Sequence, residues 1–422
     1  MHWIAYTVLA SVMVVSAAAA TRIKVKGERL AQTTVKATQS ELLEKALELA
    51  TAHGAYKQVN ARNGRPVAKL GRTPGSACAV IRFLTSYLQD RGPRQDIWRQ
   101  AETLAEWVIG LQVPQIGDIA FGGVPSTPDR TAPGNSYYYS IDAAICADAM
   151  LRLHALSGSE EYLASARSFA DFLVAMYDHG SKLLASGERG FCEFIVRAEI
   201  PKWNCNFYVK NLLALPVLSE ISRRTGERRY SDIATRVRPF LVSGLDGGWE
   251  YADVTAMSEC RPDRTTCPTS WRRIQGSHGE PDTFVYGDTI AYGLRGLFEY
   301  EGPSDDVVRI YKKFADYRDD CCAKDGYDGR IAWAGYFNVP LQAPDRASGY
   351  YDLVTLGILH DLKKAIVPEH FDIAHEFLIK RFFYAATRSW KVPFNLKSPM
   401  RETIDLTTIA ALGEALLLSA ER

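Results

Sequence analysis

The sequence lacks several features that would place it in a familiar class of protein. Its 50 Lys and Arg residues almost balance its 49 Asp and Glu residues, so no overall charge draws the chain to nucleic acid or to an anionic membrane. Beyond residue 20, no segment stays apolar over the roughly 20 residues that a membrane-spanning helix requires. We therefore expect no nucleic-acid partner and no membrane span in the mature chain.

The motifs of several large enzyme classes are absent as well. The chain contains no GxSxG, GxxxxGK[ST] or HExxH motif, and no GxGxxG follows a predicted strand. Its eight cysteines form no CxxC pair, and its eight histidines do not cluster. These absences argue against a serine hydrolase, a nucleotide-binding protein, a metalloprotease and a zinc protein. We predict no cofactor and no metal site.

The N-terminus is the one strongly apolar stretch. Residues 1–20, MHWIAYTVLASVMVVSAAAA, end in small residues, and Ala18 and Ala20 fit a signal-peptidase site. We predict a signal peptide that is cleaved after Ala20, and hence a secreted or periplasmic protein. Because no Lys or Arg precedes the apolar run, an uncleaved N-terminal anchor is the alternative. Residues 21–37 then form a polar lead-in to a single domain that spans residues 38–422.

Export permits disulfide bonds, and the cysteines fall in two kinds of setting. Cys78 and Cys146 lie in apolar helical patterns, where we expect buried free thiols. Four others enclose polar inserts: Cys192 with Cys205, and Cys260 with Cys267. The second of these pairs brackets the loop RPDRTT, and we predict a disulfide between its members.

A helical hairpin pattern occurs twice in the middle of the chain. In the segment 142–174, a helix rich in small apolar residues leads through a Ser-Gly turn into an amphipathic helix. The turn and the second helix return at a constant offset. The matching positions are Gly158, Tyr162, Ala166, Phe172, Leu173 and Val174 against Gly226, Tyr230, Ala234, Phe240, Leu241 and Val242. Such internal similarity indicates a repeat architecture.

Apolar residues at helical spacing predict about twelve helices in six pairs. They fall at residues 39–53, 76–90, 95–112, from 142, from 160, 207–224, 228–243, 287–300, 304–318, 350–364, 369–387 and 403–420. Short turns follow one member of each pair and long inserts follow the other. One member is rich in Ala, Gly and Leu, whereas its partner has a charged face.

A helix that is apolar on all sides is buried, and a helix with a charged face lies outside. We therefore predict an all-α fold, an (α/α)6 toroid in which six inner helices are ringed by six outer helices. The long loops, with short strands, gather on one face of the toroid. An open superhelical solenoid would show the same hairpins, but six pairs and an abrupt end favour a closed ring.

Hairpins with a Gly-x-x-x-Tyr-x-x-x-Ala turn and loops with Gly-Gly-aromatic segments resemble the six-hairpin carbohydrate-active enzymes. This group includes unsaturated glucuronyl hydrolases and other toroidal glycoside hydrolases, polysaccharide lyases and uronyl epimerases. The resemblance covers residues 40–420 and is architectural, so it assigns no single family. It implies a sugar-binding cleft at the N-terminal ends of the inner helices.

Aspartates recur where predicted inner helices begin. Asp142, Asp288 and Asp352 stand there with a tyrosine nearby, and Asp405 occupies a similar position. Two carboxyl groups in a cleft can serve as acid and base across a glycosidic bond. Asp142 and Asp288 are the favoured pair because each follows a long insert, and Asp352 is the third candidate. Alternatively, each aspartate only caps its helix or interacts with the helix dipole.

The long inserts carry aromatic, amide and acidic side chains that suit sugar recognition by stacking and by hydrogen bonds to hydroxyl groups. The candidates for substrate binding are Tyr137, Tyr138, Tyr139, Trp203, Asn204, Asn206, Trp249, Glu250, Tyr286, Trp333, Tyr350 and Tyr351. The alternative for these residues is structural, because the same side chains pack loops onto helices.

Our leading hypothesis is an exported glycoside hydrolase that cleaves an oligo- or polysaccharide, acidic sugars included, by carboxylate acid/base catalysis. A lyase or epimerase acting on a uronic-acid polymer is the second hypothesis. In that enzyme Tyr208 or His278 would act as the base, and Asn206 would help to neutralise the uronate. The third hypothesis is a non-catalytic toroid that binds a glycan or a protein. The sequence leaves the oligomeric state open.

Overall fold

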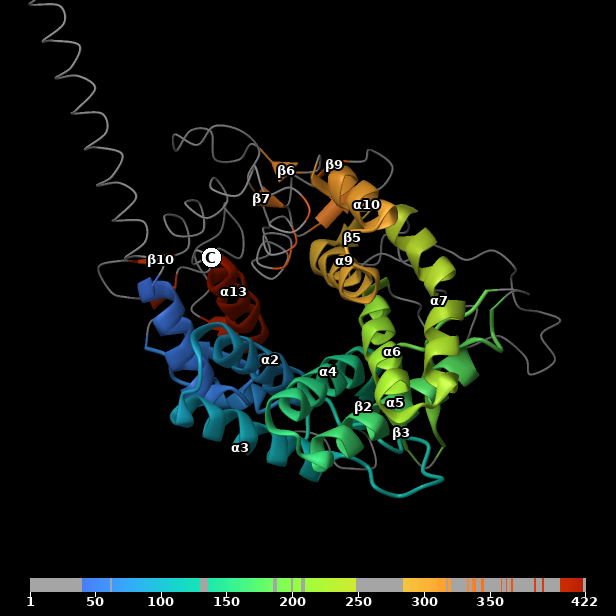
Figure 1. The fold of residues 1–422 in the computed structure, drawn as a ribbon, viewed down its shortest axis with the longest axis horizontal. Helices are drawn as coiled ribbons and strands as arrows, with labels where there is room; N and C mark the ends of the chain where they lie inside the picture. Colours follow the sequence, from blue (N-terminus) through green and yellow to red (C-terminus); the bar gives the residue numbers. More distant parts are fainter. Residues whose placement is uncertain are drawn as a thin grey trace, which may run out of the picture.

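The computed structural model places the helices in two layers around a central axis (Figure 1). It describes residues 40–60, 63–129, 136–184, 188–198, 200–205, 209–247, 284–315 and 403–419, with short strands and single positions between residues 318 and 390. The predicted signal peptide and lead-in lie outside these residues. Within the described part, no helix combines the length and the apolar character that crossing a membrane would need.

The inner layer is built from helices whose N-terminal ends all face the long inserts. Its described members are α2 (Pro74–Arg91), α4 (Ser140–Ser157), α6 (Ala214–Thr225), α9 (Gly287–Glu301) and α13 (Leu406–Ser419). The outer layer contains a helix over residues 40–53, α3 (Gln95–Leu111), α5 (Glu160–Gly180), α7 (Arg228–Gly247) and α10 (Asp305–Ala315). This alternation confirms the predicted all-α toroid.

Glycines set both the turns and the closest packing of the inner helices. Gly158 and Gly226 end α4 and α6 in the left-handed conformation, with φ of 72° and 76°, which explains why the repeated turn contains glycine. Gly296 of α9 allows a close approach to a 3-10 helix, η3 (Val209–Leu213). A Cβ atom there would lie 2.4 Å from backbone atoms of Leu212 and Leu213.

The two ends of the described chain meet and close one seam of the ring. Strand β1 (Gln58–Asn60) pairs antiparallel with β12 (Thr403–Asp405), with Val59 opposite Ile404. Directly after this pair, α13 packs against α2, and Figure 1 shows these two helices side by side. Because the first and last segments pair, the structure favours the closed ring over an open solenoid.

The inserts form small antiparallel sheets at the end of the ring where the inner helices begin, here called the long-loop end. Strands β2 (Ser136–Tyr139), β3 (Phe194–Arg197) and β4 (Lys202–Asn204) make one sheet. A second sheet contains β5 (Phe284–Tyr286), β8 (Tyr336–Asn338) and β9 (Ala343–Pro344). A third sheet pairs β6 (Arg318–Asp319) with β7 (Ala332–Trp333). The opposite end, where the inner helices finish in tight turns, is the short-turn end.

Several predicted helix bounds were wrong because short strands or a 3-10 helix occupy those residues. The helix predicted for 304–318 stops at Ala315, and residues 318–319 belong to β6. Within the predicted helix 369–387, β10 (Phe383–Tyr384) pairs with β11 (Ser389–Trp390). The segment predicted as helix 207–224 runs as 3-10 helix over Val209–Leu213 before α6 begins.

The prediction of free thiols at Cys78 and Cys146 was wrong. These residues form a disulfide between α2 and α4, with their Cα atoms 4.9 Å apart. The bridge thus joins the N-terminal halves of two consecutive inner helices. A second disulfide joins Cys192 to Cys205. The pair Cys260–Cys267 lies outside the described residues.

Candidate functional site

The first turn of α4 is anchored to the insert sheet and carries Asp142. The backbone N–H of Ser140 donates a hydrogen bond to the carbonyl of Glu193 (2.9 Å), and the Ser140 hydroxyl donates to the carbonyl of Cys192 (2.5 Å). The Cys192–Cys205 disulfide and the bond from the Glu193 N–H to the Asn204 carbonyl (2.8 Å) fix this segment in turn. The start of α4 is therefore held by contacts far apart in the sequence.

Asp142 is partly buried against the first turn of α2. A Cβ atom built on Gly75 would lie 2.6 Å from the Asp142 Oδ1 atom, so the carboxyl group occupies space that any other residue at position 75 would need. Burial raises the pKa of Asp142 to about 6, although the charges of Lys210 and Lys57 act in the opposite direction. A carboxyl group with this pKa holds a proton in mildly acidic solution, as a general acid requires.

Tyr139 and Glu193 belong to the same neighbourhood as Asp142. Burial raises the pKa of the Tyr139 phenol to about 12, and the charges of Glu193 and Asp142 add to that rise. The phenol is therefore protonated at neutral pH and suits a hydrogen-bond donor better than a base. Sequence reasoning missed Glu193, because only the pairing of Tyr139 with Phe194 across β2 and β3 brings it next to α4.

The three consecutive tyrosines before α4 differ in exposure. Tyr137 is 41 % exposed, whereas Tyr138 is 2 % exposed, a burial that favours packing over sugar contact. The rings of Tyr137 and Tyr139 stack at 6.3 Å, and both contact Phe194. Of the three, Tyr137 offers the most surface to a ligand.

Trp203 and Asn204 lie in β4, on the same sheet. The Trp203 indole stacks on the imidazole of His179, with ring centres 4.0 Å apart and planes inclined by 5°. Only the other face of the indole remains for a sugar. Burial lowers the pKa of His179, and the nearby charge of Lys182 lowers it further, so the stacked imidazole is neutral at pH 7.

Other predicted site residues are placed only in part. Asp288 is the second residue of α9, Tyr286 ends β5 and Trp333 ends β7, but their side chains are not described. The remaining candidates lie outside the described residues and stay predictions. They are Tyr208, His278, Asp352, Asn206, Trp249, Glu250, Tyr350 and Tyr351.

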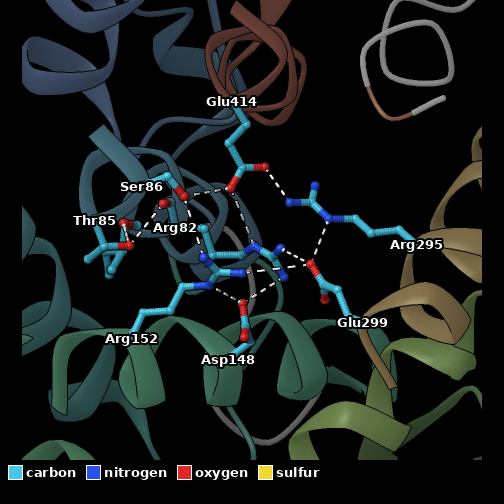
Figure 2. Close-up of polar contacts among 9 residues, drawn as sticks. Arg82, Thr85, Ser86, Asp148, Arg152, Arg295, Glu299 and Glu414 are labelled. Atoms are coloured by element: carbon cyan, nitrogen blue, oxygen red, sulfur yellow. Dashed lines mark hydrogen bonds and ion pairs between the residues drawn. The ribbon is translucent and has the colours of Figure 1, made fainter. Parts of the chain in front are cut away.

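Ion pairs connect four inner helices on the short-turn side of Asp142. Figure 2 shows side chains from α2, α4, α9 and α13 pointing toward one another; we call Arg82, Asp148, Arg152, Arg295, Glu299 and Glu414 the central ion-pair network. Arg82 contacts Asp148 at 2.7 Å and Glu299 at 2.9 Å. Arg295 contacts Glu414 at 2.6 Å and Glu299 at 3.1 Å, and Arg152 contacts Asp148 at 2.8 Å. Three guanidinium groups thus meet three carboxylates.

A small cavity lies on the long-loop side of the network. It has a volume of about 20 Å³ and is lined by Ile145, Tyr292 and Ala410, next to Arg82 and Arg295. That volume holds about one water molecule and no sugar ring. This cavity is therefore no candidate for binding a sugar.

Comparison with known proteins shows the fold. The sequence matches no known protein family, and no curated protein resembles it at a significant level. Among solved structures, the unsaturated glucuronyl hydrolase of Bacillus sp. GL1 aligns with a TM-score of 0.60 at 13 % identity, over 90 % of this chain and 97 % of that chain. The cellobiose 2-epimerase of Spirochaeta thermophila gives 0.57 at 13 % identity, over 92 % and 98 %.

A sugar epimerase from a ruminal bacterium aligns with a TM-score of 0.58 at 10 % identity, over 92 % of this chain and all of that chain. At such low identity the likeness shows the fold alone. The chain therefore has the six-hairpin (α/α)6 toroid that glycoside hydrolases share with sugar epimerases and isomerases, as the hairpin pattern predicted.

Proposed function

We propose that this protein is an exported carbohydrate-active enzyme, a glycoside hydrolase in which Asp142 acts as the general acid. The observation that carries the proposal is the partly buried Asp142 carboxyl, with its pKa raised to about 6, in the first turn of an inner helix at the long-loop end. Perturbed carboxyl groups of this kind are typical of catalytic sites. The two disulfides in the described residues fit an oxidising compartment outside the cytosol.

In the proposed reaction, the Asp142 carboxyl donates its proton to the glycosidic oxygen as the bond to the anomeric carbon breaks. A second carboxylate, Asp288 or Glu193, activates the water that adds to that carbon and takes up its proton, or attacks the carbon first as a nucleophile. A separation of about 5 Å between the two carboxyl groups would predict retention of configuration, and about 6.5–9.5 Å would predict inversion.

The charges around Asp142 suit an acidic sugar. Lys57 and Lys210 lie close enough to affect its pKa, and their ammonium groups would attract the carboxylate of a uronic acid. The same cations support the second candidate function, a lyase or epimerase that removes the proton next to a neutralised uronate carboxyl. The structural neighbours include sugar epimerases, which also supports this second candidate function.

The test begins with turnover assays on neutral and uronate-containing oligosaccharides. Release of reducing ends identifies a hydrolase, an unsaturated product absorbing in the ultraviolet identifies a lyase, and an inverted sugar centre identifies an epimerase. On the substrate that reacts, D142N is expected to lower kcat by about 10²–10⁴-fold, the usual contribution of acid/base catalysis. D178N, which changes an exposed aspartate on α5, is the matched control and should retain activity. Full activity of D142N would refute the assignment of Asp142.

A further inference from the structure

The ring contains a second, larger cavity at its short-turn end. It has a volume of about 420 Å³ and is lined by residues of α2, α4, α6 and α9, including Arg152, Ala155, Ser219, Arg224 and Tyr300. Binding sites for small molecules have volumes of roughly 300–1,000 Å³, so this cavity is large enough for one. None of the site residues predicted from the sequence lies in this cavity.

The central ion-pair network separates this cavity from the candidate catalytic site. Arg82, Arg295 and Glu414 face the small cavity on the long-loop side. Asp148, Arg152 and Glu299 line the larger cavity on the short-turn side. Since the two sets are bonded to each other across the same layer (Figure 2), the network lies between the two cavities.

The wall of this cavity combines charged hydrogen-bonding groups of both signs. Arg152 bonds Asp148 at 2.8 Å and Arg224 bonds Glu220 at 2.6 Å. Glu299, the third carboxylate of the wall, is paired with Arg82 at 2.9 Å and Arg295 at 3.1 Å, so every charge of the wall has a nearby partner of opposite sign. Such a balanced wall gives little attraction for an ion. Each guanidinium nevertheless has five N–H donors and each carboxylate about four acceptor positions, more than these ion pairs use.

Apolar groups lie between these charges. Leu151, Pro216, Val217 and the ring of Tyr300 line the same cavity. A molecule that fits this wall presents hydroxyl groups at its edges and C–H groups on its faces, as a pyranose sugar does. We propose that the short-turn cavity is a second binding site, selective for a neutral mono- or disaccharide and independent of the reaction at Asp142.

The proposal is tested by saturation-transfer NMR with glucose, cellobiose and maltose, using a sugar that the wild-type protein does not turn over. A155W and S219W place an indole in the cavity and are expected to weaken binding at least tenfold. L156W is the matched control, because Leu156 is the next residue of α4, is 39 % exposed and does not line the cavity. It should bind like the wild type. Circular dichroism of A155W and S219W shows whether each variant keeps the helical content of the wild type.

Three results would overturn the proposal. The first is that none of the three neutral sugars binds the wild-type protein. The second is that a folded A155W or S219W variant binds as well as the wild type, which would place binding elsewhere. The third is that glucuronate binds at the cavity more tightly than the neutral sugars do. None of these results bears on Asp142, because turnover is measured separately.

Discussion

Carboxyl groups lie at two depths of the inner ring, and burial acts on both. At the long-loop end, burial of Asp142 outweighs the charges of Lys210 and Lys57 and raises its pKa to about 6. In the central ion-pair network, burial alone would also raise the pKa of Glu299. The charges of Arg82, Arg295 and Arg152 instead hold that pKa below its ordinary range, and Glu414 is lowered in the same way.

The difference comes from the balance between burial and nearby cations. Arg82 and Arg295 bond Glu299 at 2.9 Å and 3.1 Å and outweigh its burial, whereas the charges of Lys210 and Lys57 do not outweigh the burial of Asp142. A carboxylate that is fully paired is poorly suited to give up or take up a proton near neutral pH. We therefore propose a structural role for Glu299 and Glu414 and a chemical role for Asp142.

The largest expected effect comes from removing the central cation. In R82M, Asp148, Glu299 and Glu414 lose a partner that is itself 5 % exposed, and the free energy of unfolding is expected to fall by about 3–5 kcal/mol. Urea unfolding measures the change. R91M, near the exposed end of the same helix, is the control and should cost less than about 1 kcal/mol. If both variants lose the same free energy of unfolding, the network has no special role in stability.

A smaller effect, opposite in sign, is expected at Asp142. Its pKa is raised above the ordinary 3.8, so the folded protein holds the proton more tightly than the unfolded chain. Ionising the buried group therefore costs stability as the pH rises from about 4 to above 6, by up to about 3 kcal/mol. D142N should be more stable than the wild type at pH 8 and about equally stable at pH 4. A D142N variant that is less stable at pH 8 would show that the Asp142 carboxylate is paired.

Glu299 and Glu414 give the reverse pH dependence. Their lowered pKa values mean that their contribution to stability is present above the ordinary glutamate range and is lost as the pH falls through the folded-state values. Lowering the pH of the wild-type protein should therefore weaken the network, and at the same time it should remove the free-energy cost of the ionised Asp142 carboxylate. Comparing D142N and E414Q across the same pH range separates the two contributions.

The fold was accessible from the sequence because its signals are local. The sequence of α4 is apolar on all sides and that of α5 has a charged face, which shows that α4 is the inner helix. Gly158 and Gly226 mark the turns. The candidate site was less accessible because it is assembled from distant segments. Asp142 was found at the helix start, but nothing near it in the sequence points to Gly75 or Glu193.

The Cys78–Cys146 disulfide also shows that contacts between helices are hard to predict from the sequence. Apolar patterns place Cys78 and Cys146 correctly inside helices, but the pattern of one helix does not say which residue of the next helix faces it. The central ion-pair network was missed for this reason too. Ser86 of α2 and Glu414 of α13 are 328 positions apart in the sequence, and Arg82 of α2 is four positions further away. Only the closed ring brings these residues together.

The smallest expected effect tests whether the position of Asp142, and not only its presence, matters. In G75A the new Cβ would lie 2.6 Å from Oδ1, so the Asp142 carboxyl must rotate away. Because only the end of a side chain moves, stability should change by less than about 1 kcal/mol. Turnover should nevertheless fall about tenfold, with a shifted alkaline limb in the pH profile, since a displaced acid no longer meets the glycosidic oxygen.

G110A is the matched control for G75A, because a Cβ on Gly110 of α3 meets nothing within 4 Å. It should leave both turnover and the pH profile unchanged. If G75A behaves like G110A, the carboxyl that Gly75 accommodates is not the one that gives up the proton. Asp142 would then resemble the deep carboxylates in role as well as in burial, and the acid would have to be sought at Glu193 or Asp288.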